Sequence, residues 1–189
     1  MTTIRNAEAR DAEHIARVHV ATWRSTYPGL VPDSILIGMS ERRHTEMWRR
    51  SVAEPRGDMV MVADHPRDGV VGFASCGALR GSNLPFAGEV YTLYVQQDHQ
   101  GNGVGRRLLA RCFGALLERG YPTAAVWVLA TNPSRYFYRA MGGELVADRT
   151  EALWGVLMDE SAYGWHDLRA ALTSPRMAVA PPPSADDHS

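Results

Sequence analysis

The sequence predicts one α/β or α+β domain built around a single sheet of mixed strand direction. Three observations lead to this class: strands and helices intermix along the chain, an early hairpin joins two apolar runs, and a strand–helix–strand unit occupies the middle. With 189 residues, the chain is long enough for one domain with a sizeable core and short for two. We therefore expect residues 1–172 to form one domain.

The N-terminal part predicts a short strand around Ile4, followed by two helical segments. Asp11 is placed to cap the first helix, whose apolar residues recur at helical spacing as far as Tyr27. The segment "PGLVP" that follows would end this helix. A second helical region is expected within residues 33–51, with a break before a cap at Ser40.

A β-hairpin and the clearest helix of the chain come next. The β-branched runs "DMVMVAD" and "GVVGFASCGAL" are joined by "HPRDG", in which Asp68 and Gly69 supply turn chemistry. A loop rich in Gly, Pro and Asn then leads to a strand over residues 89–95. After a glycine-rich junction, apolar residues from Val104 onward mark one face of a helix that ends at Gly120.

The C-terminal third predicts a buried strand, a short helix and two further strands. "TAAVWVLA" is typical of the buried strand, and Asn132 and Pro133 begin the helix in "NPSRYFYRAMGG". The two further strands are expected within residues 143–158 and 161–168. The last segment, 173–189, is proline-rich and poor in large apolar residues, so we expect a disordered tail.

Composition excludes several classes of partner. The formal net charge is −1, and no basic block gathers on a predicted face, so nucleic acid is not expected as a partner. No apolar run approaches the roughly 20 residues that span a bilayer. The N-terminus "MTTIRNAEARD" lacks the apolar core of a secretory leader, so we expect a cytoplasmic protein with no membrane partner. A homodimer is compatible with the sequence.

Cysteine and histidine spacing gives no metal signal. Cys76 and Cys112 have no CxxC partner, which favours two small buried side chains over a disulfide or a zinc knuckle. His14 and His19 are five residues apart, off the spacing that puts two ligands on one helix face. His99 would either contact phosphate or lie solvated on the surface. We therefore expect no metal.

The junction "QGNGVGRRL" holds three glycines at alternate positions, Gly101, Gly103 and Gly105. It lacks the Gly-Lys pair of a Walker phosphate loop, and Arg106 stands where a dinucleotide fingerprint needs its third glycine. Glycines at this point let backbone N–H groups approach an anion at a helix N-terminus, where the macrodipole favours negative charge. Because Arg106 and Arg107 add positive charge in the first turn, we favour a phosphate site over a merely flexible turn.

The motif Gln100-x-x-Gly103-x-Gly105, preceded by the strand "EVYTLYV", resembles the acyl-CoA signature Q/R-x-x-G-x-G/A of the GNAT superfamily of N-acetyltransferases. Weaker likenesses, among them "TWRSTYPGLVP" and "YGWHDL", extend over about residues 3–170. The resemblance implies a GNAT-like, mostly antiparallel central sheet flanked by helices, with a strand–loop–helix acetyl-CoA site. It also implies acetyl transfer from acetyl-CoA to a primary amine of a small molecule or peptide.

By the same resemblance, main-chain groups hold acetyl-CoA, which would be the cosubstrate. Its pantetheine arm would pair with the backbone of Leu93 and Val95. Asn132 would either cap its helix or contact the pantetheine amides. The pyrophosphate would lie on the junction, where the implied residues are Gln100, Gly101, Asn102, Gly103, Val104, Gly105 and Arg106.

Transfer to an amine requires a base and an acid, because the ammonium must lose a proton and the leaving thiolate gains one. Glu89 is the candidate base, since a carboxylate at this point of the strand serves as base in several GNAT enzymes. Strand alternation would place Glu89, Tyr91, Leu93 and Val95 on one face, where large neighbours raise its pKa. The alternative is a solvated residue at the start of a strand.

Tyr138 is the candidate acid, because GNAT chains often direct a tyrosine of this helix at the thioester sulfur. Its alternative role is core packing. A backbone N–H near Tyr94 would polarise the acetyl carbonyl, again by family likeness. A covalent route would need a cysteine beside a histidine base, and neither cysteine is so placed, which favours direct transfer in a ternary complex.

By the same resemblance, the first two helices and the loops beside the cofactor strand would line the acceptor pocket. This points to Trp23 and Tyr27 as substrate-binding residues, with Arg24 and loop 80–86 nearby, although aromatic residues there could equally be core. Two other functions remain open from the residues alone. One is a catalytically inactive acyl-CoA-binding regulatory protein, and the other is a protein that binds a different phosphate ligand.

Overall fold

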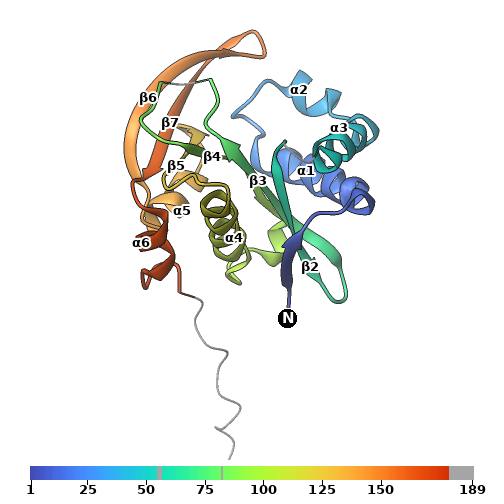
Figure 1. Ribbon diagram of the computed structural model, residues 1–189. Coiled ribbons are helices and arrows are strands. Elements are labelled where there is room, and N and C mark those ends of the chain that lie inside the picture. The colour runs from blue at the N-terminus through green and yellow to red at the C-terminus, as the bar shows by residue number, and fades with distance from the viewer. Residues whose placement is uncertain (55–56, 82, 179–189) are drawn as a thin grey trace, which may run out of the picture.

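A seven-stranded sheet in the order β1-β2-β3-β4-β5-β7-β6 organises the computed structural model, which describes residues 1–54, 57–81 and 83–178 (Figure 1). Neighbouring strands are antiparallel except for β4 and β5, which run parallel. The expected mixed, mostly antiparallel sheet is therefore confirmed. The strands are β1 (Thr3–Asn6), β2 (Met59–His65), β3 (Gly69–Ala78), β4 (Gly88–Val95), β5 (Ala124–Leu129), β6 (Glu144–Leu153) and β7 (Val156–Trp165).

Helices cover both faces of the sheet. In Figure 1 the sheet separates α1 and α3 on one side from α4 and α6 on the other. The helices are α1 (Ala12–Thr26), α2 (Asp33–Gly38), α3 (Glu41–Ala53), α4 (Val104–Glu118), α5 (Ser134–Ala140) and α6 (Leu168–Thr173), with short 3₁₀ turns η1 (Ala9–Asp11) and η2 (Gln97–His99). No helix of the described residues is long and apolar enough to cross a membrane.

Strand periodicity divides the core into two layers. Along β2, Met61 packs with the α4 layer, whereas Val60 and Val62 pack with the α1 and α3 layer. This is the alternation that a strand buried on both faces must have. Cys76 and Cys112 are fully buried free cysteines in the α4 layer, which confirms their expected role as small buried side chains.

Asp11 does not cap α1 with its side chain as expected, although it stands at the N-cap position. Its carboxylate instead accepts hydrogen bonds from Arg5 at 2.7 and 2.9 Å and from the Glu8 N–H at 2.7 Å. Arg5 also donates to Asp64 of β2 at 2.9 Å. A buried carboxylate prefers a cation to a lone amide because the charge is then compensated. The ion pair therefore joins β1, η1 and β2.

The C-terminal part differs from the sequence prediction in its strand boundaries. Residues 143–158 hold a whole strand, a turn and the start of the next strand, because Trp154 (φ 53°) and Gly155 (φ 81°) form a two-residue hairpin turn. Two positive φ angles give the twist that a two-residue hairpin needs. The "WG" pair does not resemble the Asn-Gly pair that usually indicates such a turn. The sequence therefore predicts a single strand within residues 143–158.

The packed part of the chain also extends further than expected. Thr173 ends α6, and Met177 is 3% exposed in the α4 layer, so residues 173–178 are not a disordered tail. The remainder of the predicted tail, 179–189, lies outside the described residues.

Replacing Asp11 tests the ion pair that ties the N-terminal segment to the sheet. The Arg5 hydrogen bond holds the pKa of Asp11 below its usual value of 3.8. A lowered folded-state pKa contributes stability above the unfolded pKa, and this contribution is lost as the pH falls below about 4. Asp11→Asn should cost about 2–3 kcal/mol at pH 7 and should flatten the loss of stability between pH 5 and pH 2 in urea titrations.

Asp98→Asn is the matched control, since Asp98 is exposed. Its unfolding free energy should follow that of the wild type across the same pH range. An equal pH dependence in Asp11→Asn and wild type would show that the pair contributes nothing specific.

Candidate active site

The site lies where two parallel strands separate. β4 and β5 pair only at Gly88 with Ala124 and at Glu89 with Ala125. Beyond these pairs the strands diverge and leave a cleft of about 1020 Å³, lined by residues 91–95 of β4 and 126–129 of β5. Helices α1, α4 and α5, the glycine loop before α4, and residues of β6, β7 and their turn supply the rest of the wall.

A β-bulge in β4 changes which side chains share a face. Thr92 pairs with Ser75 and Val90 pairs with Cys76, so Tyr91 is an extra residue. A bulge reverses the alternation beyond it. The prediction that Glu89, Tyr91, Leu93 and Val95 share one face is therefore wrong. Glu89 shares its face with Thr92 and Tyr94 toward α1, whereas Leu93 and Val95 pack toward α4.

The register also decides which backbone groups of β4 are free. The Gln96 N–H donates to Val71 O at 2.9 Å, and Tyr94 is paired with Phe73. Because hydrogen-bonded pairs alternate in an antiparallel ladder, Tyr94 directs its backbone groups to β3. Leu93 and Val95 then direct theirs into the cleft.

We expect a backbone N–H near Tyr94 to polarise the acetyl carbonyl. The N–H of Tyr94 itself cannot do so, because it faces β3 and not the cleft. The backbone groups of its neighbours Leu93 and Val95 face that space instead. One of them already has a partner, because the Gln100 side chain donates to Val95 O at 2.9 Å.

The glycine junction has the backbone that an anion site requires. Gly101 (φ 75°) and Gly103 (φ 74°) both adopt the left-handed conformation, and Gly103 is the N-cap of α4. Both line the cleft together with Gly105. Gly105 has ordinary φ, and a Cβ there would lie 3.6 Å from the Phe137 ring. The helix N-terminus thus presents its free N–H groups to the cleft.

The two arginines of the first turn of α4 have separate environments. Arg106 lines the cleft, and its buried Nε atom has no hydrogen-bond partner. Arg107 points away and donates to Thr2 O at 2.7 Å. Only Arg106 can therefore contact an anion on the glycine loop.

Asn132 and Tyr138 of the α5 segment face the cleft from the opposite wall. Asn132 is 3% exposed, accepts from the Ser134 N–H at 2.9 Å and donates to the Tyr27 hydroxyl at 3.3 Å. Its capping interaction is thus present. Tyr138 is buried, and burial raises the pKa of its phenol. No hydrogen bond among the described residues uses its hydroxyl, which leaves a protonated donor beside the cleft.

Glu89 is buried at the point where β4 and β5 part. Burial raises the pKa of its carboxyl above 4.5, against the opposing effect of the Arg80 N–H, which donates to it at 2.8 Å. The pKa of Glu89 is therefore raised as expected. The cause is burial on the α1 face of the sheet, not packing beside Leu93 and Val95. Glu89 is not among the residues that line the cleft, so a water molecule would have to connect it to a ligand there.

A second carboxylate, Glu160 of β7, does line the cleft, and sequence reasoning missed it. Arg149 of β6 donates to it at 2.9 and 2.8 Å. The same guanidinium stacks 3.9 Å from the centre of the Trp127 ring. Only the cross-strand register of β5, β6 and β7 brings these side chains together, so no local motif could have indicated them.

Aromatic side chains close the cleft near α1. Trp23 and Tyr27 line it as predicted, with ring centres 4.6 Å apart. Trp154, from the β6–β7 turn, meets Trp23 edge-on at 5.6 Å. Arg24 does not line the cleft, because its guanidinium donates to the backbone at Leu36 and Met39.

Within the described part of the chain, the buried side-chain polar atoms that lack a partner all belong to residues of this cleft. They are Thr22 Oγ1, Trp23 Nε1, Arg106 Nε and Trp127 Nε1. A buried polar atom without a partner costs about 1–3 kcal/mol. Their concentration here indicates that the cleft is built for a polar ligand.

Comparison with known proteins gives one consistent family. A sequence model of the acetyltransferase (GNAT) family matches residues 19–142. The uncharacterised N-acetyltransferase YuaI of Bacillus subtilis is 37% identical over 174 residues, which cover 92% of this chain and 98% of YuaI.

Solved structures share the fold. The PaiA N-acetyltransferase of Thermoplasma acidophilum, in complex with coenzyme A, has a TM-score of 0.65 and 15% identity, covering 85% of this chain and 98% of that one. A phosphinothricin acetyltransferase of Sinorhizobium meliloti, in complex with acetyl-CoA, has a TM-score of 0.62 and 23% identity, covering 87% of both chains.

The wall behind Tyr94 depends on a neutral histidine. His19 stacks on Tyr94 at 5.4 Å and accepts from Trp48 Nε1 at 3.1 Å, which puts its own proton on Nε2. Burial lowers the pKa of His19 to about 3. In ¹⁵N-resolved NMR titrations its ring should stay in this neutral form from pH 8 down to pH 4.

The exposed His14 supplies an internal comparison in the same spectra. A His19 signal that titrates near pH 6.5 would contradict the buried, neutral ring.

Proposed function

The chain belongs to the GNAT family of acetyltransferases, and from that membership we propose that it moves an acetyl group from acetyl-CoA directly to the primary amine of a small molecule or peptide. The observation that carries this proposal is the cleft between β4 and β5. It combines a left-handed glycine loop, a free strand edge and buried polar atoms without partners. Donor and acceptor would meet in one ternary complex.

The cosubstrate fits the donor side of the cleft. A pyrophosphate would accept from the N–H groups of the Gly101–Gly105 loop and contact Arg106, whose Nε has no partner. An amide-bearing arm would pair with the backbone of Leu93 and Val95, as an added strand does at an open edge. Bound acetyl-CoA supplies an activated thioester. The chain's own residues then position it and move the protons.

Glu89 would act as the base through a water molecule. Its raised pKa suits a carboxylate that must accept a proton near neutral pH. Glu160 is the weaker candidate base, because its carboxylate is already engaged by the Arg149 guanidinium. In this account Glu160 instead attracts the ammonium group of the acceptor, beside the aromatic wall of Trp23 and Tyr27.

Tyr138 would act as the acid toward the leaving thiolate. Tyr138 lines the cleft, no hydrogen bond among the described residues uses its hydroxyl, and its raised pKa keeps it protonated. A backbone N–H of Leu93 or Val95 would stabilise the negative charge that develops on the acetyl oxygen. Asn132 would hold α5 in place through its cap and its bond to Tyr27.

Release of free thiol from acetyl-CoA over a panel of primary amines tests the function. We expect turnover with at least one amine, and thermal stabilisation by CoA in the wild type.

Gly103→Val should lose CoA stabilisation, because a β-branched residue cannot adopt φ 74° and would crowd the loop. Gly114→Ala, within α4 and away from the cleft, is the control. Stabilisation without turnover on any amine would favour the inactive regulator.

Tyr138→Phe removes only the proposed acid. We expect kcat to fall about 100-fold while the Kd for CoA changes less than about twofold. Tyr136→Phe removes an exposed hydroxyl from the same helix and should leave kcat unchanged. A collapse of CoA binding in Tyr138→Phe would assign that hydroxyl a structural role instead.

Glu89→Gln tests the base. The carboxylate is the active form, so wild-type kcat/KM should fall as the pH drops through the raised Glu89 pKa, and the variant should lack that step. At pH 7 we expect a loss of about 100-fold. Glu160→Gln is the paired variant and should chiefly raise KM for the amine. If only Glu160→Gln removes the acid limb, Glu160 is the base.

A further inference from the structure

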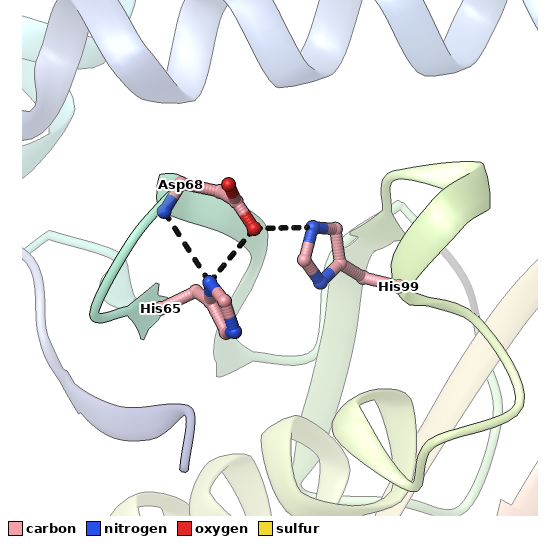
Figure 2. A group of neighbouring side chains, drawn as sticks. All are labelled: His65, Asp68 and His99. Atoms are coloured by element: carbon pink, nitrogen blue, oxygen red, sulfur yellow. Dashed lines mark hydrogen bonds and ion pairs between the residues drawn. The ribbon is translucent and has the colours of Figure 1, made fainter.

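Two histidines and an aspartate converge outside the cleft. His65 at the end of β2, Asp68 in the β2–β3 turn and His99 in η2 bring one ligand atom each within 4.8 Å of one another (Figure 2). Asp68 Oδ2 lies 2.8 Å from His65 Nδ1 and 3.3 Å from His99 Nε2. Figure 2 shows the three side chains pointing toward one another from separate segments.

The turn holds two of these groups in fixed positions. Pro66 follows His65 directly and presets the turn, and Gly69 closes it at φ 68°. His65 is paired across the hairpin with Gly69. The third group is fixed by η2, where the His99 N–H donates to Gln96 O at 2.9 Å. The cluster is therefore preorganised by backbone structure rather than by flexible side chains.

The two imidazole rings are also held against each other. Their centres lie 5.0 Å apart with planes tilted by 58°, and the Asp68 N–H lies 3.3 Å from His65 Nδ1. One ligand atom from each residue therefore faces the same small space, where a single cation could contact all three.

We propose that His65, Asp68 and His99 form a binding site for a divalent transition-metal ion of the Zn²⁺ type, with His65 Nδ1, an Asp68 carboxylate oxygen and His99 Nε2 as ligands. Imidazole and carboxylate are donors that zinc accepts, and three protein ligands leave one position for water. Bonds of about 2.0–2.1 Å in tetrahedral geometry separate ligand atoms by roughly 3.3 Å. The Asp68 to His99 separation of 3.3 Å already has this value, whereas the His65 to Asp68 separation of 2.8 Å would have to widen on binding.

Partial exposure lets an ion enter from solvent. The side chains of His65, Asp68 and His99 are 25%, 51% and 19% exposed. The expectation of no metal rests on the spacing of possible ligands along the sequence. These three residues come together only in the fold, from the β2–β3 turn and from η2. A bound ion would join that turn to the segment leading into Gln100 and the glycine loop. Its effect on the cosubstrate would rest on the function proposed above, but the ion itself can be detected without CoA.

Metal titration of the purified full chain, after removal of metals with a chelator, tests the site. Calorimetry with Zn²⁺ should give one equivalent bound, and Co²⁺ should give the visible absorption of a low-symmetry site containing nitrogen ligands. His65→Ala, His99→Ala and Asp68→Asn should each weaken Zn²⁺ binding by at least about tenfold. His14→Ala, which removes an exposed histidine elsewhere, should bind as the wild type does.

Circular dichroism in the presence of chelator establishes that each variant is folded. The ligands come from two separate segments, the β2–β3 turn and η2. If a variant in one segment misfolds, the variant in the other segment still tests whether Zn²⁺ binds there. Wild-type protein that binds no Zn²⁺ in this titration would overturn the proposal. Equal affinity in wild type and a folded His65→Ala/His99→Ala variant would also overturn it, because the ion would then be bound elsewhere on the chain.

Discussion

The early separation of β4 from β5 is the constraint on which the rest of the structure depends. Two parallel strands in one sheet would normally continue to pair, yet these share only two residue pairs. The bulge at Tyr91 bends β4 away at that point. This leaves an edge in the middle of the sheet, where backbone groups of Leu93 and Val95 have no strand partner and can bind a ligand instead.

The cleft lowers the stability of the ligand-free protein, because buried polar atoms in it have no hydrogen-bond partner. Unpaired polar atoms of Thr22, Trp23, Arg106 and Trp127 gather there. A ligand that satisfies these groups binds the folded chain selectively and stabilises it. The same bulge leaves Glu89 on the α1 face of β4, whereas Leu93 and Val95 pack toward α4.

Sequence reasoning succeeded where the signal is local. The glycine loop, the helix that follows it and the turn at Asp68 and Gly69 each depend on neighbouring residues, and the structure has them. It failed where partners are distant in sequence. The extra residue Tyr91, the Arg5 partner of Asp11 and the contacts of Arg149 with Glu160 and Trp127 all depend on strand register or tertiary packing, which periodicity does not encode.

Amide hydrogen exchange in β4 tests the central claim most directly. The N–H groups of Leu93 and Val95 should exchange quickly in the free protein and at least about tenfold more slowly with saturating CoA, because the ligand replaces the missing strand. The Tyr94 N–H, already paired with β3, should be slow in both states. Unchanged exchange at Leu93 and Val95 in a protein that has bound CoA would contradict the account.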